Sequence, residues 1–372
     1  MLKPRASIAR MSPYHSPIGS RSGLSLDLNE SMAGCSPRVL ARLRSLSTAD
    51  VSLYPQREIG ERLIADFLGL APEQVLLANG VDEALLLLFA NYLGPTDKDP
   101  NDKDTSDEGA SGELLFADPT FVMYPMLGAA LGAQVVRLRS GEDLALPVAD
   151  FLARISPRTR VIAIANPNNP TGLATPRADL LKIAEAAPDA AVLIDEAYFE
   201  FCGEFCGETL IPDLESHPNL FVARTFSKAY GLAGLRLGVL TGVAEQIEYL
   251  RRFCVPFNVN AVALACIEEA LADQAFVRDH VAQVKRGRQQ LEQLFDELGL
   301  RFWPSQTNFV LVRVGAPAQT FVEAMQRRGI MVRDSSANPG CEGCVRITVG
   351  TPSQMDGVVQ AIREAIAEIH RS

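Results

Sequence analysis

The sequence predicts an α/β protein, with a mostly parallel central sheet in a large domain and a smaller α+β domain that includes an N-terminal arm. Short apolar segments alternate with helical patterns from about residue 75 to residue 240, which is typical of parallel sheets covered by helices on both faces. Beyond residue 260, a long helical region precedes two strand-like segments and a final helix. The length of 372 residues is sufficient for one large domain and one smaller domain.

The predicted large domain begins with an apolar strand at residues 75–78, which leads through Asn79-Gly80 into a helix from Asp82 to Tyr92. Further strands are expected at residues 114–117, 134–138, 161–165, 191–194, 220–223 and 237–240. A surface loop is expected at 95–113, because this segment is rich in Asp, Lys, Gly and Ser and has no large apolar residue. Ligands of such sheets bind beyond the carboxyl ends of the strands, so the residues that follow each strand are the candidates for function.

The predicted smaller domain begins with a helical region at 262–298, followed by strands at 308–314 and 345–349. The final helix is expected to begin at Ser353, whose capping box reaches Asp356. We therefore expect an arm and part of the small domain at 1–45, the large domain at 46–260 and the rest of the small domain at 261–372.

Charge and composition exclude several classes of partner. The net charge of −10 argues against nucleic acid or an anionic membrane as the main partner, and no apolar run is long enough to span a bilayer. The seven cysteines are an odd number in a long chain, which predicts reduced thiols and a cytoplasmic location. Pro4, Pro13 and Pro17 would interrupt the helix of a transit peptide, so the first residues are predicted to form an arm.

No metal site is predicted. Cys341 and Cys344 have the CxxC spacing, and Cys202 and Cys206 form a second pair. The second pair arises from a tandem repeat of Phe-Cys-Gly-Glu at 201–208, and the four histidines are isolated from one another.

The segment from Thr225 to Gly238 carries the strongest chemical signal. Lys228 follows a serine and precedes Arg236 by eight residues, with small residues between them. A lysine that forms a Schiff base needs a dry setting, because desolvation lowers its pKa. Small neighbours allow a flat cofactor to approach the backbone, and an arginine supplies a permanent cation for an anion such as phosphate.

Other strand ends carry weaker signals of the same kind. Asn169 lies in a turn-rich loop after the 161–165 strand, where its amide could donate to a ring oxygen or simply belong to a tight loop. Asp195 ends a buried strand and could pair with a protonated pyridine or cap a helix. The backbone N–H groups at Val81 and Asp82 begin a helix and could bind phosphate. Phe121 or Tyr124 could stack on a flat ring or pack in the core.

Together these segments resemble the class I/II aminotransferases of fold type I, and within that family they are most similar to the histidinol-phosphate aminotransferase branch. The similarity extends from about residue 8 to residue 369 and rests on the motifs at 166–172, 195–198 and 225–238. The resemblance implies pyridoxal 5'-phosphate as the cofactor, with Lys228 as the lysine that bonds it and moves the proton. By the same resemblance, Asp195 pairs with the pyridine nitrogen, while Asn169 and Tyr198 bond the phenolic oxygen.

The resemblance also assigns the phosphate and the substrate. The phosphate is expected on the amides of Val81 and Asp82, on Thr225 or Ser227, on Arg236, and on Tyr54 of the neighbouring subunit in a homodimer. The substrate is expected on Arg346, which matches the arginine that grips an anionic group, and on Arg333 and Asn29. The implied partners are a small-molecule amino donor and a 2-oxo acid.

The resemblance predicts transfer of an amino group from histidinol phosphate to 2-oxoglutarate, as in histidine biosynthesis. One departure from the branch is Ala33, where the family has an aromatic residue that closes over the substrate. An aromatic amino-acid aminotransferase is therefore the alternative, and a decarboxylase of a phosphorylated amino acid is a further one.

Overall fold

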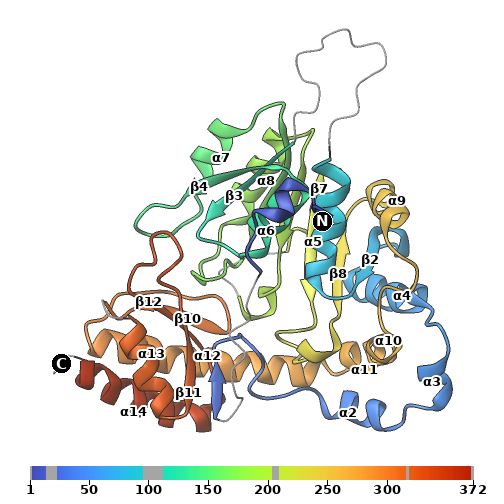
Figure 1. Ribbon diagram of the computed structural model, residues 1–372. Helices are drawn as coiled ribbons and strands as arrows, with labels where there is room; N and C mark the ends of the chain where they lie inside the picture. The colour runs from blue at the N-terminus through green and yellow to red at the C-terminus, as the bar shows by residue number, and fades with distance from the viewer. Residues whose placement is uncertain (1, 14–22, 95–111, 203–208, 316–317, 370–372) are drawn as a thin grey trace.

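The computed structural model describes residues 2–13, 23–94, 112–202, 209–315 and 318–369 (Figure 1). Its larger sheet has seven strands in the order β2-β8-β7-β6-β5-β3-β4, and only β8 runs antiparallel to its neighbours. The prediction of an α/β protein with a mostly parallel central sheet is confirmed. The strands are β2 (Val75–Ala78), β3 (Glu113–Asp118), β4 (Gln134–Arg139), β5 (Thr159–Ala165), β6 (Ala191–Asp195), β7 (Leu220–Thr225) and β8 (Gly238–Thr241).

Helices cover both faces of this sheet, because alternate residues of each strand point to opposite sides. Leu114 and Phe116 of β3 join one buried cluster, whereas Leu115 and Ala117 join another. The first cluster is completed by α5 (Val81–Tyr92), α6 (Met123–Leu131) and α9 (Ala244–Phe253). The second is completed by α7 (Val148–Arg154) and α8 (Arg177–Ala186).

A second sheet has five strands in the order β1-β11-β12-β10-β9. They are β1 (Leu24–Leu26), β9 (Phe302–Trp303), β10 (Phe309–Arg313), β11 (Ile330–Asp334) and β12 (Cys344–Thr348). β1 runs parallel to β11, which lies near the other end of the sequence, so the N-terminal segment completes a sheet made by the C-terminal part of the chain. The sheet lies beside α12 (Gln274–Glu297), α13 (Ala318–Arg327) and α14 (Pro352–Ile369) at the lower left of Figure 1.

Several element boundaries differ from the sequence predictions. The helical region predicted at 262–298 consists of α10 (Ala261–Ala265), α11 (Ile267–Ala272) and α12. The last helix begins at Pro352, and the Gln354 side chain accepts a hydrogen bond from the N–H of Thr351, so the box from Ser353 to Asp356 is wrong. Other helices are α1 (Ala6–Ala9), α2 (Pro37–Arg44), α3 (Thr48–Ser52) and α4 (Arg57–Leu68), with short 3-10 turns at 72–74, 199–201, 211–213 and 233–235.

The prediction of a surface loop at 95–113 is wrong at its last residue. Glu113 is the first residue of β3, is buried and pairs with Arg154 at 3.0 Å. Residues 95–111 of that prediction lie outside the described part of the chain, as does most of the repeat at 201–208. The division of the chain at residues 45 and 260 stays a prediction.

The cysteines differ from expectation at one position. Cys202 is disulfide-bonded, so the prediction of reduced thiols is wrong there, whereas Cys35, Cys254, Cys266, Cys341 and Cys344 are free. Within the described ranges, no His, Cys, Asp and Glu side chains gather into a group of at least three that could hold a metal ion. Nor do those ranges contain a helix long and apolar enough to cross a membrane.

Candidate active site

A cavity of about 560 Å³ lies beyond the carboxyl ends of β5, β6 and β7, where it also meets side chains of the smaller sheet. It brings together residues that are far apart in the sequence. With the exception of Tyr54, every predicted site residue lines it: Asn29, Val81, Asp82, Phe121, Asn169, Asp195, Tyr198, Thr225, Ser227, Lys228, Arg236, Arg333 and Arg346.

Lys228 presents its amine to this cavity. Burial lowers the pKa of the Lys228 amine to about 8, and the like charge of Arg346 contributes to that shift in the same direction. The ammonium form is held by the carbonyl oxygen of Leu28, with Nζ to O at 3.2 Å. A sizeable fraction of this amine is therefore neutral near pH 8, which is the form that can attack a carbonyl carbon.

Asp195 lies at the end of β6 and is buried, with 4% of its surface exposed. Its Oδ2 accepts a hydrogen bond from the Tyr124 hydroxyl at 2.9 Å, and its Oδ1 accepts one from the N–H of Ala197 at 3.1 Å. Burial raises the pKa of the Asp195 carboxyl to about 6, and these two hydrogen bonds oppose the rise. A positively charged partner in the cavity would stabilise the ionised form.

The start of α5 forms a cradle for an anion. Gly80 has φ 82°, and a Cβ there would lie 2.4 Å from Arg236 Nη2, so only glycine allows the guanidinium this close. A Cβ at Gly238 would lie 2.5 Å from the amide nitrogen of Val81, so β8 approaches the same turn closely. Arg236 also pairs with Asp82 at 2.9 Å, and both side chains are partly exposed. The helix N-terminus and the arginine are thus arranged as in anion-binding sites.

Thr225 and Ser227 lie at the carboxyl end of β7 at the edge of the cavity, and both are buried. The Thr225 hydroxyl accepts a hydrogen bond from the N–H of Ser227 at 3.1 Å. Its own proton remains available for an acceptor in the cavity.

Arg346 and Arg333 lie directly opposite each other on β12 and β11. Arg346 donates from Nη1 to Asn169 Oδ1 and from Nη2 to the carbonyl oxygen of Asp27, both at 2.6 Å. Asn169 therefore accepts with its oxygen and has its NH₂ group available for another acceptor. Like charges opposite each other on a sheet are unfavourable, so this pair suits a negatively charged ligand.

Tyr54 lies elsewhere. Its side chain is 80% exposed and stacks on Phe257, with ring centroids 4.4 Å apart. It is outside the cavity of this chain.

The sequence did not point to several residues of the site. They include Asp27, Thr120, Ser335 and Asn338 of the cavity wall. Tyr124 was expected at this edge as a ring that could stack on a cofactor, and its hydroxyl donates to Asp195. Tyr124 is an aromatic near Phe121 in the sequence, and its ring meets that of Phe121 edge to face with centroids 5.8 Å apart. The four wall residues carry no local motif, because only the folded chain brings them to the cavity.

A mostly parallel sheet whose strand ends present a desolvated lysine beside a buried carboxylate is the arrangement of the fold-type I transferases. Within this class, the chain belongs to the class I and II aminotransferases, since residues 22–362 match the family described as "Aminotransferase class I and II". The match covers both sheets and every predicted site residue.

Curated relatives agree with this family. Histidinol-phosphate aminotransferase 1 of Bacillus cereus is 35% identical over 346 residues, which cover 91% of this chain and 88% of the relative. Histidinol-phosphate aminotransferase of Symbiobacterium thermophilum is 34% identical over 380 aligned positions, which cover 98% and 99% of the two chains. Histidinol-phosphate aminotransferase from Sinorhizobium meliloti, solved in complex with pyridoxal-5'-phosphate, shares the fold with a TM-score of 0.88, 24% identity and 99% coverage of each chain.

Proposed function

We propose that this aminotransferase moves the amino group of histidinol phosphate to 2-oxoglutarate, a step of histidine biosynthesis, with pyridoxal 5'-phosphate as its cofactor. The observation that carries the substrate assignment is the facing pair of Arg333 and Arg346 at the cavity. A phosphate dianion can bind both cations, and the two carboxylates of 2-oxoglutarate can each bind one.

The two arginines distinguish histidinol phosphate from an aromatic amino donor. Phenylalanine has a single carboxylate, so an aromatic donor would leave one of the two arginines without an anion. The curated relatives also favour histidinol phosphate, because those named above are histidinol-phosphate aminotransferases. A decarboxylase would release carbon dioxide and would need no 2-oxo acid.

The cavity suits the proposed cofactor. The anion cradle at Gly80, Val81 and Arg236 would hold the phosphate, and Asp195 would pair with the pyridine nitrogen. Phe121 lines the cavity and could stack on the ring, while Asn169 and Tyr198 would bond the phenolic oxygen. When bound, the cofactor supplies an electron-withdrawing ring next to the carbon that carries the amino group.

The chain's own residues supply binding and proton movement. Lys228 Nζ would take the proton from the amine-bearing carbon and return it later, because its lowered pKa leaves part of the amine neutral near pH 8. Arg346 and Arg333 would orient the substrate by its anions. Asp195 would keep a positive charge stable at the ring nitrogen.

The test is a single-turnover reaction of the protein loaded with pyridoxal 5'-phosphate. With histidinol phosphate, we expect the cofactor absorbance to change and the corresponding ketone to appear in the mass spectrum. We expect kcat/KM to exceed that for phenylalanine by on the order of 100-fold. Comparable values for the two donors, or carbon dioxide release without an oxo acid, would contradict the proposal.

Replacing Arg333 by Gln tests whether this arginine recognises the phosphate of the amino donor. The Arg333→Gln change removes a charged hydrogen-bond donor, so kcat/KM for histidinol phosphate should fall by roughly 10- to 100-fold. Reaction with phenylalanine should change little, since that donor needs one arginine only. An equal loss for both donors would indicate that Arg333 does not read the phosphate.

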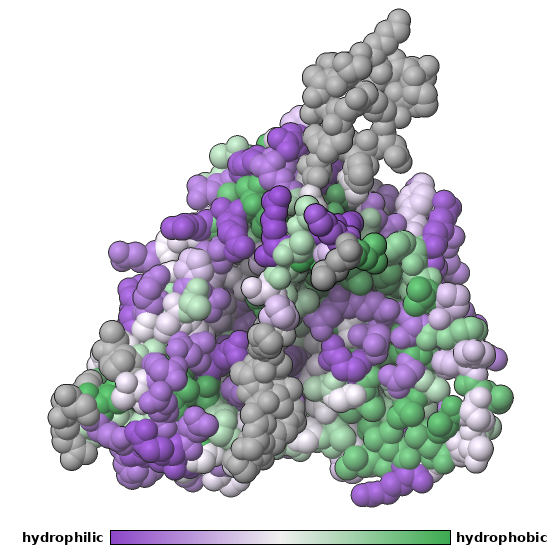
Figure 2. Space-filling view, in the orientation of Figure 1, coloured by the Kyte–Doolittle hydropathy of each residue, from purple (hydrophilic) through white to green (hydrophobic). Residues whose placement is uncertain are grey.

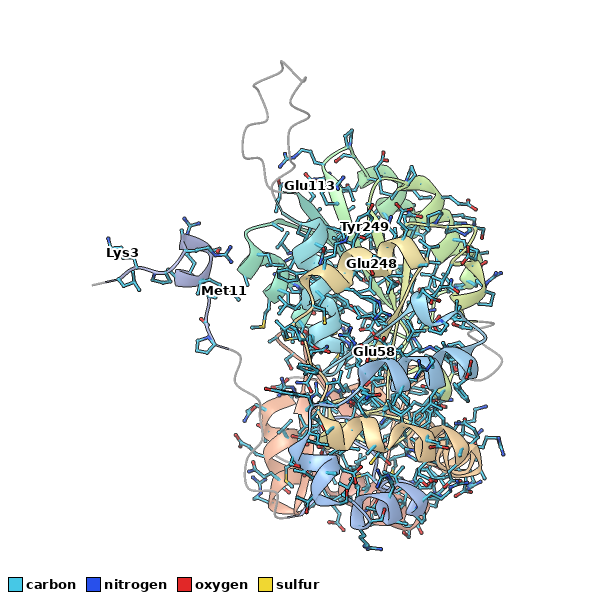
Figure 3. All side chains as sticks on the ribbon, turned by 90° about the vertical axis from the view of Figure 1, so that its right-hand side faces the viewer. Lys3, Met11, Glu58, Glu113, Glu248 and Tyr249 are labelled. Atoms are coloured by element: carbon cyan, nitrogen blue, oxygen red, sulfur yellow. The ribbon has the colours of Figure 1, made fainter. Side chains whose placement is uncertain are left out.

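We further propose that the protein is a homodimer in which Tyr54 reaches the phosphate site of the neighbouring subunit. Large apolar side chains are exposed together on one face, which we call the apolar face: Val51 66%, Leu53 66%, Tyr54 80%, Phe253 56%, Val255 61% and Phe257 53%. Figure 2 shows a hydrophobic area at the lower right of the molecule, and Figure 3, in which Glu58 and Tyr249 are labelled, views that side directly. Contiguous apolar surface of this kind usually marks an interface.

Sedimentation equilibrium should give twice the chain mass of 40.3 kDa. The Leu53→Asp change would place a charge within the interface and should shift the protein toward monomer. Leu152, which is 41% exposed on α7 outside this face, offers the matched control, and Leu152→Asp should leave the mass unchanged. A monomeric wild-type protein would exclude the dimer.

A cytoplasmic location is proposed as well. The free thiols of Cys35, Cys254, Cys266, Cys341 and Cys344 suit a reducing compartment, whereas the disulfide of Cys202 does not. Cell fractionation tests this, and recovery outside the cytoplasmic fraction would overturn it.

A further inference from the structure

Asn29 connects the two sheets through its side-chain amide, and only 1% of its surface is exposed. Its Nδ2 donates to the Tyr198 hydroxyl oxygen at 2.9 Å, just beyond the end of β6. Its Oδ1 accepts from the Thr348 hydroxyl at 3.1 Å, on the last residue of β12. Both ends of the amide are thus engaged by protein groups, one beside each sheet.

The orientation of this amide is fixed by its surroundings. The backbone N–H of Asn29 donates to Thr348 Oγ1 at 3.1 Å, so that oxygen acts as an acceptor there. Among the hydrogen bonds of the described residues, the buried Thr348 hydroxyl donates to Asn29 Oδ1, and in that orientation Nδ2 faces Tyr198. Asn308 holds the backbone as well, because its Nδ2 donates to the carbonyl oxygen of Asn29 at 3.1 Å.

This orientation determines what the Tyr198 hydroxyl can do. An amide NH₂ is only a donor, so Tyr198 Oη must accept from Asn29 and cannot direct its own proton there. Tyr198 lines the cavity, and its ring centroid lies 5.9 Å from Lys228 Nζ. The phenol proton is therefore available to an acceptor inside the cavity.

We propose that Asn29, locked by Thr348, is a positioning residue that sets the direction in which the Tyr198 hydroxyl donates. The acceptor is the phenolic oxygen of the cofactor, so this inference rests on the proposed function. Thr348 and Arg346 lie on one face of β12, at alternate positions of the strand. The strand that holds the substrate anion in the proposed function thus also orients the tyrosine.

Two substitutions at position 29 separate this role from a purely structural one. Asn29→Asp has the same shape, but its carboxylate accepts the Tyr198 proton and reverses the hydrogen bond. Asn29→Ala leaves the proton free for the cofactor. Alanine is strained at this residue, whose φ is 56°, whereas aspartate tolerates that conformation as asparagine does. A structural role therefore predicts that Ala is the more harmful change, and our proposal predicts that Asp is.

The full-length protein provides two measurements: cofactor affinity at about pH 9, where an introduced aspartate is expected to be ionised, and a pH titration of the residue at position 198. The dissociation constant for pyridoxal 5'-phosphate should rise by roughly 10- to 100-fold with Asn29→Asp and by less than about 10-fold with Asn29→Ala. Separately, a fluorotyrosine at position 198 reports its ionisation by ¹⁹F NMR before the cofactor is added. Its pKa should increase in the order Asn29, Asn29→Ala, Asn29→Asp, because the amide donor stabilises the phenolate and the carboxylate opposes it.

Thr348→Val is an independent variant, at a buried residue that does not line the cavity. It removes the hydroxyl that locks the amide and should raise the fluorotyrosine pKa and weaken cofactor binding by a few fold. The inference is overturned if Asn29→Asp matches the wild type in both measurements or if Asn29→Ala is the weaker binder. A further outcome is that the protein binds no pyridoxal 5'-phosphate at all while the three fluorotyrosine pKa values keep the expected order. In that case the proposed function fails and the orienting role of Asn29 stands.

Discussion

A protein with alanine in place of Lys228 is expected to lose transamination by on the order of 10⁵-fold or more while it keeps its fold. Lys228 carries the one lysine amine among the described residues that line the cavity. Its pKa of about 8 makes it both a nucleophile and a proton carrier near neutral pH, and the guanidinium groups of Arg236, Arg333 and Arg346 can do neither. The measurement is kcat/KM for histidinol phosphate, together with the absorbance of the bound cofactor.

The fold should survive this change because the amine is costly where it lies. Burial lowers the pKa of Lys228, which means that the folded protein disfavours its charged form. Removal of the amine relieves this cost and leaves only the carbonyl oxygen of Leu28 without its 3.2 Å donor. We therefore expect a midpoint of thermal unfolding close to that of the wild type.

Lys228→Arg is the matched control for charge. It keeps a cation in the cavity but provides no amine that can become neutral, so it should be as inactive as Lys228→Ala. Near-normal turnover in either variant would remove Lys228 from the catalytic role.

The sequence was sufficient to place Lys228, Asp195 and Asn169 near one another, because parallel strands end at the same edge of a sheet. It could not predict Tyr124 beneath Asp195, since the hydroxyl reaches the carboxylate across 71 positions of sequence. The sequence also did not predict that Arg333 and Arg346 lie opposite each other, for a similar reason. β11 was not recognised as a strand, and its pairing with β12 is a property of the folded sheet.

The N-terminal segment illustrates the limit of local patterns most clearly. β1 has only three residues and pairs with β11, so nothing near it in the sequence signals a strand. Asn29 follows it, and the family resemblance implied that this residue binds substrate. Its contacts with Tyr198 and Thr348 span 169 and 319 positions, so local patterns do not reveal the contacts from which we infer a positioning role.

Asp195→Asn should lower kcat by about 10³-fold while the fold is kept. The substituted amide has the same shape, so a hydrogen bond to Tyr124 can be retained, but the negative charge is lost. In the proposed function that charge stabilises a proton on the ring nitrogen, and the low-dielectric site increases its effect. Single-turnover rates with histidinol phosphate measure the change, and a loss of less than about 10-fold would contradict a charge-based role.

The same carboxylate should give cofactor binding a characteristic pH dependence. The pKa of Asp195 is raised to about 6 by burial, so the carboxyl takes up a proton as the pH falls below 6 and can no longer stabilise a cationic ring. Affinity for pyridoxal 5'-phosphate should therefore decrease below pH 6, and in Asp195→Asn this part of the dependence should be absent. The cofactor phosphate also titrates near pH 6, and comparing the two proteins cancels that common contribution.

Tyr124→Phe moves this dependence in a defined direction. The Tyr124 hydroxyl donates to Asp195 at 2.9 Å and stabilises the ionised carboxylate, so its removal should raise the pKa of Asp195 further. The pH at which cofactor affinity begins to fall should then increase, whereas affinity well above that pH should change by less than about 10-fold. Equilibrium titrations of the wild type, Tyr124→Phe and Asp195→Asn over the acidic range measure the shift. A midpoint that stays the same in all three proteins would mean that Asp195 does not face the ring nitrogen.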